Sequence, residues 1–323
     1  MPKAIVSTSA SPFHFGHLEL YRVASKLFGV KNVTVAIGKN SKKNCDLDQI
    51  NFHMIPYKIP FELADNITLS DYCEKNSIKY IVRGIRDSKD TDYELMLSYI
   101  NKELKSDLKT IFFPTDERFR NISSSLLNEL LRYEKFGTIK KFMNEDAMYR
   151  FFHKKPEFVV FFGKSCSGKT SYINKKYDKD FVNVDSIFWD IFSLCFGKKE
   201  MELVKKLSYE AIYSKNSLDK LIDKYSTDEF WSIMLSFIKD NYKKTNYTDK
   251  NLNYSSYILD FPSIGCYWKK IKPEIRSRFY LVKLETNNNK RKGFITNRKM
   301  ESKINYLDYN YRDPEYFDKI VTI

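Results

Sequence analysis

One short run constrains the fold of this 323-residue chain more than any other feature. Residues 163–170 read GKSCSGKT and match the pattern G-x-x-x-x-G-K-S/T, in which glycines let the backbone curl around phosphate groups. Five apolar residues, 158–162, precede the run, and a helix-like stretch follows it. A buried strand, a glycine-rich loop and a helix in this order predict a parallel α/β sheet with a nucleotide site at its edge.

The motif also predicts which side chains meet the nucleotide. Lys169 is expected to reach the β- and γ-phosphates, and the Thr170 hydroxyl to ligate Mg²⁺. The loop adds to this expected ATP site Gly163, Ser165, Ser167 and Gly168.

Two later carboxylates and a basic segment extend this site. Asp185 and Asp260 each follow an apolar strand-like run, where an aspartate commonly caps a helix. Beside a phosphate loop, Asp185 is predicted to act as a base or orienting group for an acceptor hydroxyl, and Asp260 to lie near the metal. Arg291 and Arg298 fall in the basic segment 290–298, which suits either a lid over phosphates or a solvated helix.

The first half of the chain alternates apolar runs with stretches of helical period. The expected strands cover residues 4–6, 32–38, 79–82 and 109–114. This alternation predicts a doubly wound α/β domain whose ligands bind at the carboxyl ends of the strands. The whole chain is therefore predicted to be α/β, with two doubly wound parallel-sheet domains.

Polar residues follow the expected strands of the first half. His14 and His17 lie where the first strand gives way to a helix, a junction at which free N–H groups and the helix dipole favour anions. Further along the chain come Lys42, Arg83, Arg86 and the serines 123–125. Because the carboxyl ends of parallel strands share one edge, these residues are expected to converge on one phosphate-binding crevice.

These motifs together resemble those of the phosphopantetheine adenylyltransferases, over about the first 140 residues. The matching parts are SASPFHFGH at 9–17, SKK at 41–43, RGIR at 83–86 followed by Asp90, Tyr93 and Glu94, and ISSS at 122–125. The H-x-G-H loop marks the wider nucleotidyltransferase superfamily, whereas the R-G-x-R run with I-S-S-S is more specific. The resemblance implies a dinucleotide-binding-like fold and ATP as a substrate.

The resemblance also implies roles for individual residues. His14 and His17 would contact the ATP phosphates, His17 would stabilise the transition state, and Lys42 would orient the attacking phosphate. Around the nucleotide it places Gly84, Arg86, Glu94, Ser123, Ser124 and Ser125. Around phosphopantetheine it places Ser9, Lys42, Leu69, Arg83 and Asn101. Two positions depart from the family, with Thr8 in place of a glycine and Ser11 in place of an aspartate.

Residues 158–323 resemble dephospho-coenzyme A kinases. The parallels are the phosphate loop, NVD at 183–185, LDFP at 259–262, the strand 279–282 before the arginine-bearing segment, and the closing run 317–321. An H-P-x-x-R segment of that family is not found in the chain, which leaves the acceptor of this half open. Lys169 and Asp185 would be its catalytic residues.

The two halves together resemble a bifunctional coenzyme A synthase, with ATP and Mg²⁺ as cofactors. Residues 1–145 would transfer AMP from ATP to 4′-phosphopantetheine, 146–157 would be a linker, and 158–323 would phosphorylate dephospho-coenzyme A. One alternative is a nicotinamide mononucleotide adenylyltransferase fused to a ribosylnicotinamide kinase. Another is an adenylyltransferase whose second domain binds nucleotide for regulation or phosphorylates another small molecule.

The net charge of +14 raises the question of nucleic acid as a partner. The lysines are spread over the chain, and polyanionic small substrates account for the same surplus, so nucleic acid is not expected as the main partner. The five cysteines show no metal-ligand spacing and fit reduced thiols. Without an apolar span or a signal peptide, a cytoplasmic protein with no membrane contact is expected, and the residues leave homo-oligomer formation open.

Overall fold

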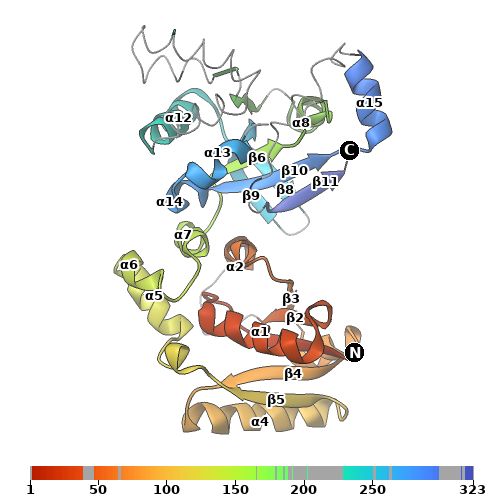
Figure 1. The fold of residues 1–323 in the computed structure, drawn as a ribbon, viewed down its shortest axis with the longest axis vertical. Helices are drawn as coiled ribbons and strands as arrows, with labels where there is room; N and C mark the ends of the chain where they lie inside the picture. Colours follow the sequence, from red (N-terminus) through yellow and green to blue (C-terminus); the bar gives the residue numbers. More distant parts are fainter. Residues whose placement is uncertain are drawn as a thin grey trace. The chain divides into compact units, whose positions relative to one another are not determined.

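Each half of the chain builds its own parallel sheet in the computed structural model (Figure 1). The chain divides into two units, Met1–Lys154 and Lys155–Ile323. The structure describes residues 2–38, 47–64, 67–164, 166–178, 180–184, 186–187, 191, 202, 228–249, 252–261, 264–297, 314 and 317–322. The predicted fold class, two α/β parallel-sheet domains, is confirmed.

The sheet of the first unit has the strand order β3-β2-β1-β4-β5, and every neighbouring pair is parallel. Its strands are β1 (Lys3–Thr8), β2 (Val33–Gly38), β3 (Phe61–Ala64), β4 (Ile78–Ile85) and β5 (Lys109–Pro114). The chain builds outward from β1 to β3 on one side and then crosses to β4 and β5 on the other. The strand order thus reverses between β1 and β4, and in open α/β sheets ligands bind at the carboxyl ends of the strands at such a point.

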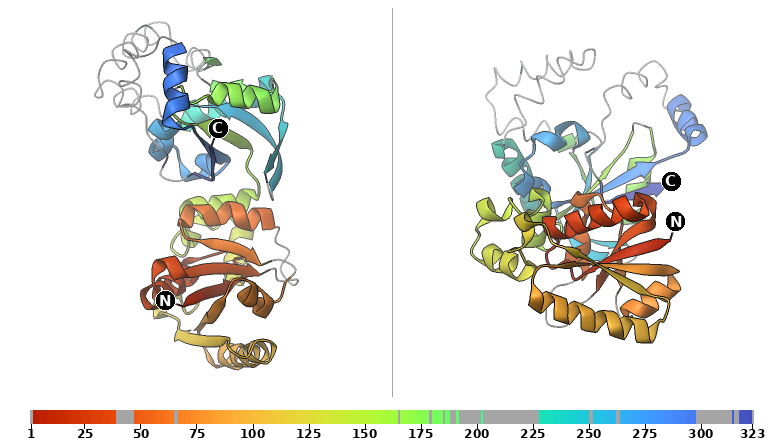
Figure 2. Two further views of the ribbon diagram at one scale, coloured as in Figure 1. Left: turned by 90° about the vertical axis from the view of Figure 1, so that its right-hand side faces the viewer. Right: turned by 60° about the horizontal axis from the view of Figure 1, so that its bottom comes forward.

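Helices cover both faces of this sheet, as Figure 2 shows. They are α1 (Phe15–Phe28), α2 (Leu47–Met54), α3 (Leu69–Lys75), α4 (Ser88–Leu104), α5 (Ser124–Arg132), α6 (Phe136–Ile139) and α7 (Glu145–His153), with short 3₁₀ turns η1 (Val30–Asn32), η2 (Ile55–Tyr57) and η3 (Glu117–Phe119). Side chains alternate across β1, so that Ala4 and Val6 join one buried cluster and Ile5 joins the other. The sheet is therefore the middle of three layers.

Helix α7 occupies most of the stretch for which the sequence predicted a linker, residues 146–157. Its Met148 and Phe151 are buried, and Gln49 of α2 donates a hydrogen bond of 2.6 Å to the Phe151 carbonyl. Arg150, fully buried, donates to the Phe52 carbonyl at 3.1 Å. The helix is thus a packed part of the first unit. Its buried face includes the charged residues Asp146 and Arg150, so the sequence shows no clear apolar period there.

The sheet of the second unit has the order β11-β10-β6-β9-β7, all parallel, and β8 pairs antiparallel with β9. Its strands are β6 (Phe158–Phe162), β7 (Val182–Asn183), β8 (Thr245–Asp249), β9 (Leu252–Asp260), β10 (Phe279–Glu285) and β11 (Lys319–Thr322). Its helices are α8 (Lys169–Tyr177), α12 (Asp228–Asn241), α13 (Ile264–Tyr267), α14 (Pro273–Arg276) and α15 (Asn288–Asn297), with the 3₁₀ turn η4 (Trp268–Lys270). Every residue of β6 is buried, because the strand lies in the middle of the sheet. No helix in the described part of the chain combines the length and the apolar character that a membrane span requires.

Candidate functional site

Two imidazoles stand at the start of α1, the first helix after β1. His14 Nδ1 accepts a hydrogen bond of 3.2 Å from the Gly16 N–H, and His17 Nδ1 accepts one of 3.3 Å from the His14 N–H. The two rings are stacked, with centroids 3.8 Å apart. Gly16 permits this, because a Cβ there would lie 3.0 Å from His14 Cε1. Since each Nδ1 accepts, the proton of each neutral ring is on Nε2, which makes both rings donors at the positive end of a helix.

Buried side chains from α2 and η2 hold the main chain of Phe13, next to the histidine pair. His53 Nε2 accepts a hydrogen bond of 3.0 Å from the Phe13 N–H, and its Nδ1 donates to the Gln49 carbonyl at 3.2 Å. Burial lowers the pKa of His53 to about 4, so the ring is neutral. The Tyr57 hydroxyl donates to the Phe13 carbonyl at 2.8 Å. Sequence reasoning missed both residues, because neither belongs to a motif and α2 mixes polar with apolar residues.

The serine run holds the same loop from α5. Ser123 caps this helix by accepting a hydrogen bond of 3.1 Å from the Leu126 N–H, as the sequence predicted for these serines. Ser124, which is buried, donates to the Pro12 carbonyl at 2.9 Å, and Asn128 one turn later donates to the Ser11 carbonyl at 2.8 Å. Ser125 is exposed on the first turn. The loop between β1 and α1 is therefore fixed by three separate elements.

Arg83, on β4, forms a bidentate ion pair with Glu94 of α4. Its Nε donates to Glu94 Oε2 at 2.6 Å and its Nη2 to Oε1, while Nη1 donates to the Ser7 carbonyl at 2.5 Å. The carboxylate of Glu94 is buried. The structure thus brings together two residues that sequence reasoning gave to different ligands, and it ties the end of β4 to the end of β1.

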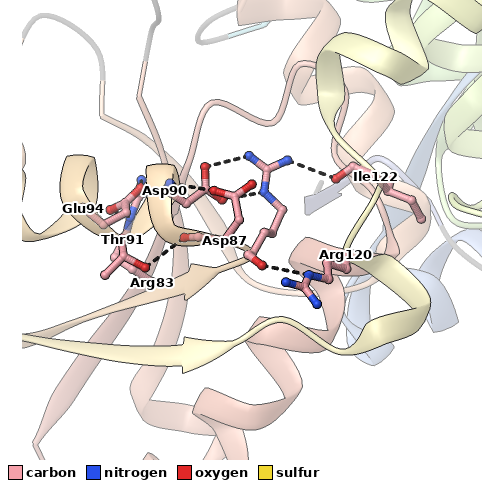
Figure 3. Close-up of polar contacts among 8 residues, drawn as sticks. Arg83, Asp87, Asp90, Thr91, Glu94, Arg120 and Ile122 are labelled. Carbon is pink, nitrogen blue, oxygen red and sulfur yellow. Dashed lines mark hydrogen bonds and ion pairs between the residues drawn. The ribbon is translucent and has the colours of Figure 1, made fainter.

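Arg86 belongs to a second polar network, whose members Asp90, Arg120 and Ile122 are labelled in Figure 3. Asp90 accepts from its Nε at 2.6 Å and from its Nη2 at 3.0 Å, and this hydrogen-bonded pair raises the pKa of Arg86. On the other side, Arg86 Nη1 lies 3.4 Å from the Ile122 carbonyl, directly before the serines. Arg120 Nε donates to the carbonyl of Arg86 at 3.0 Å. The arginine therefore bridges α4 and the loop that leads into α5.

In the second unit, the glycine-rich loop for which the sequence predicts phosphate binding lies between β6 and α8. Gly163 has a φ of 153°, and a Cβ there would come within 2.4 Å of the Leu284 carbonyl oxygen. Gly168 has a φ of 82° and forms the N-cap of α8. Lys169 Nζ donates to the Lys164 carbonyl at 2.9 Å, so the lysine folds back over its own loop. Only glycine fits position 163 without strain, because any other residue would add a Cβ that collides with Leu284.

A hydroxyl and a carboxylate meet beside this loop. Thr170 Oγ1 donates a hydrogen bond of 2.8 Å to Asp260 Oδ2. Parallel pairing aligns Asp260, at the end of β9, with Phe161 of β6, which places the carboxylate next to the loop. Burial raises the pKa of Asp260. Its Oδ1 is buried and has no hydrogen-bond partner among the described residues.

Curated relatives match the first part of the chain. The phosphopantetheine adenylyltransferase of Cytophaga hutchinsonii is 32% identical over 152 residues, which cover 43% of this chain and 95% of that protein. That of Vesicomyosocius okutanii is 35% identical over 134 residues, or 40% of this chain and 84% of that protein. The N-terminal part of this chain belongs to the phosphopantetheine adenylyltransferase family.

Comparisons with solved structures and with family models give no assignment beyond the phosphopantetheine adenylyltransferases. TmcAL of Thermotoga maritima bound with alpha-thio ATP aligns with a TM-score of 0.32 at 13% identity, over 48% of this chain and 56% of that one. A NadR protein in complex with NAD and AMP-PNP aligns with a TM-score of 0.30 at 10% identity, over 99% of this chain and 90% of that one. Both likenesses are too weak to support an assignment. No protein-family model matches the chain.

The residues predicted for phosphopantetheine in this adenylyltransferase unit lie on several elements. Leu69 begins α3, and the next residue, Ser70, donates a hydrogen bond of 3.2 Å to Asn101 Oδ1 on α4. Ser9 directly follows β1, and Arg83 lies within β4. Lys42 is outside the described residues, so its predicted role stays a prediction.

The predicted residues of the second unit are described in part. Gly163, Ser167, Gly168, Lys169 and Thr170 lie in the loop and the first turn of α8, and Arg291 lies on α15. Outside the described residues lie Ser165, Asp185 and Arg298. The adenylyltransferase membership does not extend to this unit.

Proposed function

We propose that the chain is a bifunctional enzyme of coenzyme A synthesis. The first unit transfers AMP from ATP to 4′-phosphopantetheine, and the second phosphorylates the resulting dephospho-coenzyme A with a second ATP. For the first unit, the supporting observation is the pair of Nε2–H donors on His14 and His17 at the start of α1, in a chain of this family. For the second, it is the phosphate loop with the Thr170–Asp260 pair.

The first reaction requires charge neutralisation and positioning, not a covalent intermediate. An oxygen of the 4′-phosphate attacks the α-phosphorus of ATP, the bond from that phosphorus to the bridging oxygen breaks, and pyrophosphate leaves. Donors that are already oriented toward the developing charge lower the barrier to such a transfer. His17 is the proposed transition-state donor, with Lys42 as the group that orients the attacking phosphate.

The ion pairs of Arg83 and Arg86 fit this proposal. Glu94 and Asp90 hold the two guanidinium groups in fixed positions near the point where the strand order reverses between β1 and β4. A preorganised arginine loses little side-chain entropy when it binds a phosphate. We propose that Arg83 serves phosphopantetheine, and that Arg86 and the serines 123–125 serve the nucleotide.

The residues of the second unit fit a magnesium ion. Asp260 Oδ1 is a buried carboxylate oxygen without a hydrogen-bond partner among the described residues, and the Thr170 hydroxyl lies beside the same carboxylate. Hard oxygen ligands of this kind suit Mg²⁺, which usually keeps several waters and one or two protein ligands next to nucleotide phosphates. Bound there, Mg²⁺ would neutralise phosphate charge. Lys169 would hold the β- and γ-phosphates, and Asp185 would orient the acceptor hydroxyl.

Product analysis by mass spectrometry tests the proposal. The full-length protein is incubated with ATP, Mg²⁺ and either 4′-phosphopantetheine or nicotinamide mononucleotide. Coenzyme A supports both activities. Dephospho-coenzyme A alone supports the first activity and contradicts the second, which leaves the second unit as a nucleotide-binding regulator or a kinase for another acceptor. Nicotinamide adenine dinucleotide as the product would overturn the proposal.

A further inference from the structure

Thr8 is the last residue of β1 and stands where the sequence departs from the adenylyltransferase pattern. Its Oγ1 lies 3.0 Å from His17 Nε2. The same oxygen accepts a hydrogen bond of 3.1 Å from the N–H of Ala10, two residues further along the loop. The backbone therefore holds the hydroxyl in contact with His17, the residue proposed to stabilise the transition state of adenylyl transfer.

The other ring nitrogen decides the direction of the contact. His17 Nδ1 accepts from the His14 N–H, so the proton of the neutral ring is on Nε2. His17 Nε2–H consequently donates to Thr8 Oγ1. Two neighbouring rings restrict the plane of the His17 imidazole. The ring of His14 stacks on it with a centroid distance of 3.8 Å, and the centroid of the Phe13 ring lies 5.2 Å away. Thr8 thus contacts the one ring atom that can donate a proton.

We propose that Thr8 is a positioning residue for His17: until an ATP phosphate takes over the N–H, Thr8 holds the ring in its Nε2–H tautomer at the carboxyl end of β1. The His14 N–H favours the same tautomer, but its contact with Nδ1 is long, at 3.3 Å, so we expect the second tautomer to become populated when Nε2–H has no acceptor. A glycine at position 8 offers no acceptor to the ring. The inference rests on the proposed adenylyl transfer for its kinetic consequence, but not for the contact itself.

Nitrogen NMR of the full-length protein, labelled with ¹⁵N only in histidine, tests the contact without any substrate. The chain has four histidines, and the spectrum of His17→Gln identifies the signals of His17. We expect the Nε2–H pattern in the wild type and in Thr8→Ser, which keeps the hydroxyl. In Thr8→Val, which keeps the shape without the hydroxyl, we expect a mixture of tautomers. Unchanged His53 signals show that the loop is intact.

Steady-state kinetics of pyrophosphate release test the consequence. Loss of one hydrogen bond that positions a transition-state donor is expected to lower kcat of Thr8→Val by about tenfold, with KM for ATP changed less than about twofold. Thr8→Ser restores most of kcat. An unchanged tautomer in Thr8→Val, or an unchanged kcat with a shifted tautomer, would overturn the proposal. A wild-type protein that forms no dephospho-coenzyme A would refute the proposed function, while the NMR experiment would still decide whether Thr8 fixes His17.

Discussion

The hydroxyl of Thr170 donates a 2.8 Å hydrogen bond to Asp260, a residue 90 positions away in the sequence. The contact joins the first turn of α8 to the end of β9, the strand next to β6. It leaves the second carboxylate oxygen without a hydrogen-bond partner among the described residues. A buried carboxylate of this kind is costly unless a cation compensates it, which agrees with the magnesium site proposed for the second unit.

Asp260→Asn is therefore expected to impair the second reaction selectively. The amide keeps the size of the side chain but removes the negative charge that the metal requires. Phosphorylation of supplied dephospho-coenzyme A should fall by about 100-fold or more. Adenylyl transfer by the first unit should be unchanged. Asp240→Asn, an exposed position on α12, serves as the matched control. Equal phosphorylation rates in the two variants would contradict a role of Asp260 at the metal.

His17→Ala and Lys169→Ala should separate the two activities. The first change removes the Nε2–H donor and is expected to lower pyrophosphate release by about two to three orders of magnitude, with phosphorylation of supplied dephospho-coenzyme A retained. The second should have the reverse effect, because Lys169 is the residue proposed to hold the ATP phosphates in the second unit. Each variant is the control for the other. Loss of both reactions in either folded variant would exclude independent sites.

The buried His53 should make stability depend on pH below neutrality. Its pKa is about 4 in the folded protein, against an ordinary value of 6.5, so between these values the unfolded chain binds the proton and the folded chain does not. The free energy of unfolding should therefore fall as the pH falls, by up to about 1.4 kcal/mol per pH unit and about 3 kcal/mol in total.

Urea unfolding of the wild type and of His53→Gln at pH 7 and pH 5 measures this dependence. Glutamine does not titrate, so the variant lacks the contribution of His53. The difference in unfolding free energy between the two proteins should narrow at the lower pH. An identical pH dependence in both would show that His53 is not the group responsible.

Truncation tests whether α7 belongs to the first unit. A chain ending after Lys154 keeps the packing of Met148 and Phe151 and the partners of Gln49 and Phe52. A chain ending after Asn144 loses them. We expect residues 1–154 to unfold cooperatively and to release pyrophosphate, and residues 1–144 to unfold at a clearly lower temperature, since removing several buried apolar groups costs a few kcal/mol. Equal unfolding temperatures would assign 145–154 to a linker.

The features that the sequence predicted correctly are local ones. Apolar runs such as 158–162 are buried strands, and the glycine-rich loop follows its strand because the motif itself contains the glycines that the turn requires. The serine cap of α5 was predictable for the same reason, since an N-cap contact spans only three residues.

The contacts that escaped prediction join residues distant in sequence. Periodicity does not reveal that His53 holds the main chain of Phe13, 40 residues earlier. The pairing of Arg83 with Glu94 was missed because each residue alone resembles a ligand contact, and only the packing of α4 against β4 brings them together. The sequence predicts a linker over 146–157, where helix α7 lies, because charged residues on the buried face of this helix hide the helical pattern.

The close approach of Gly163 to β10 bears on which substitutions this loop tolerates. A Cβ at this position would collide with the main chain of Leu284, which belongs to a neighbouring strand. In a library randomised at each glycine codon, position 163 should therefore return glycine even when only folded protein is selected and no nucleotide is supplied. Gly38 and Gly137, where a Cβ would meet nothing within 4 Å, should accept alanine in the same screen. Invariance at position 163 would then reflect the sheet and not the ligand.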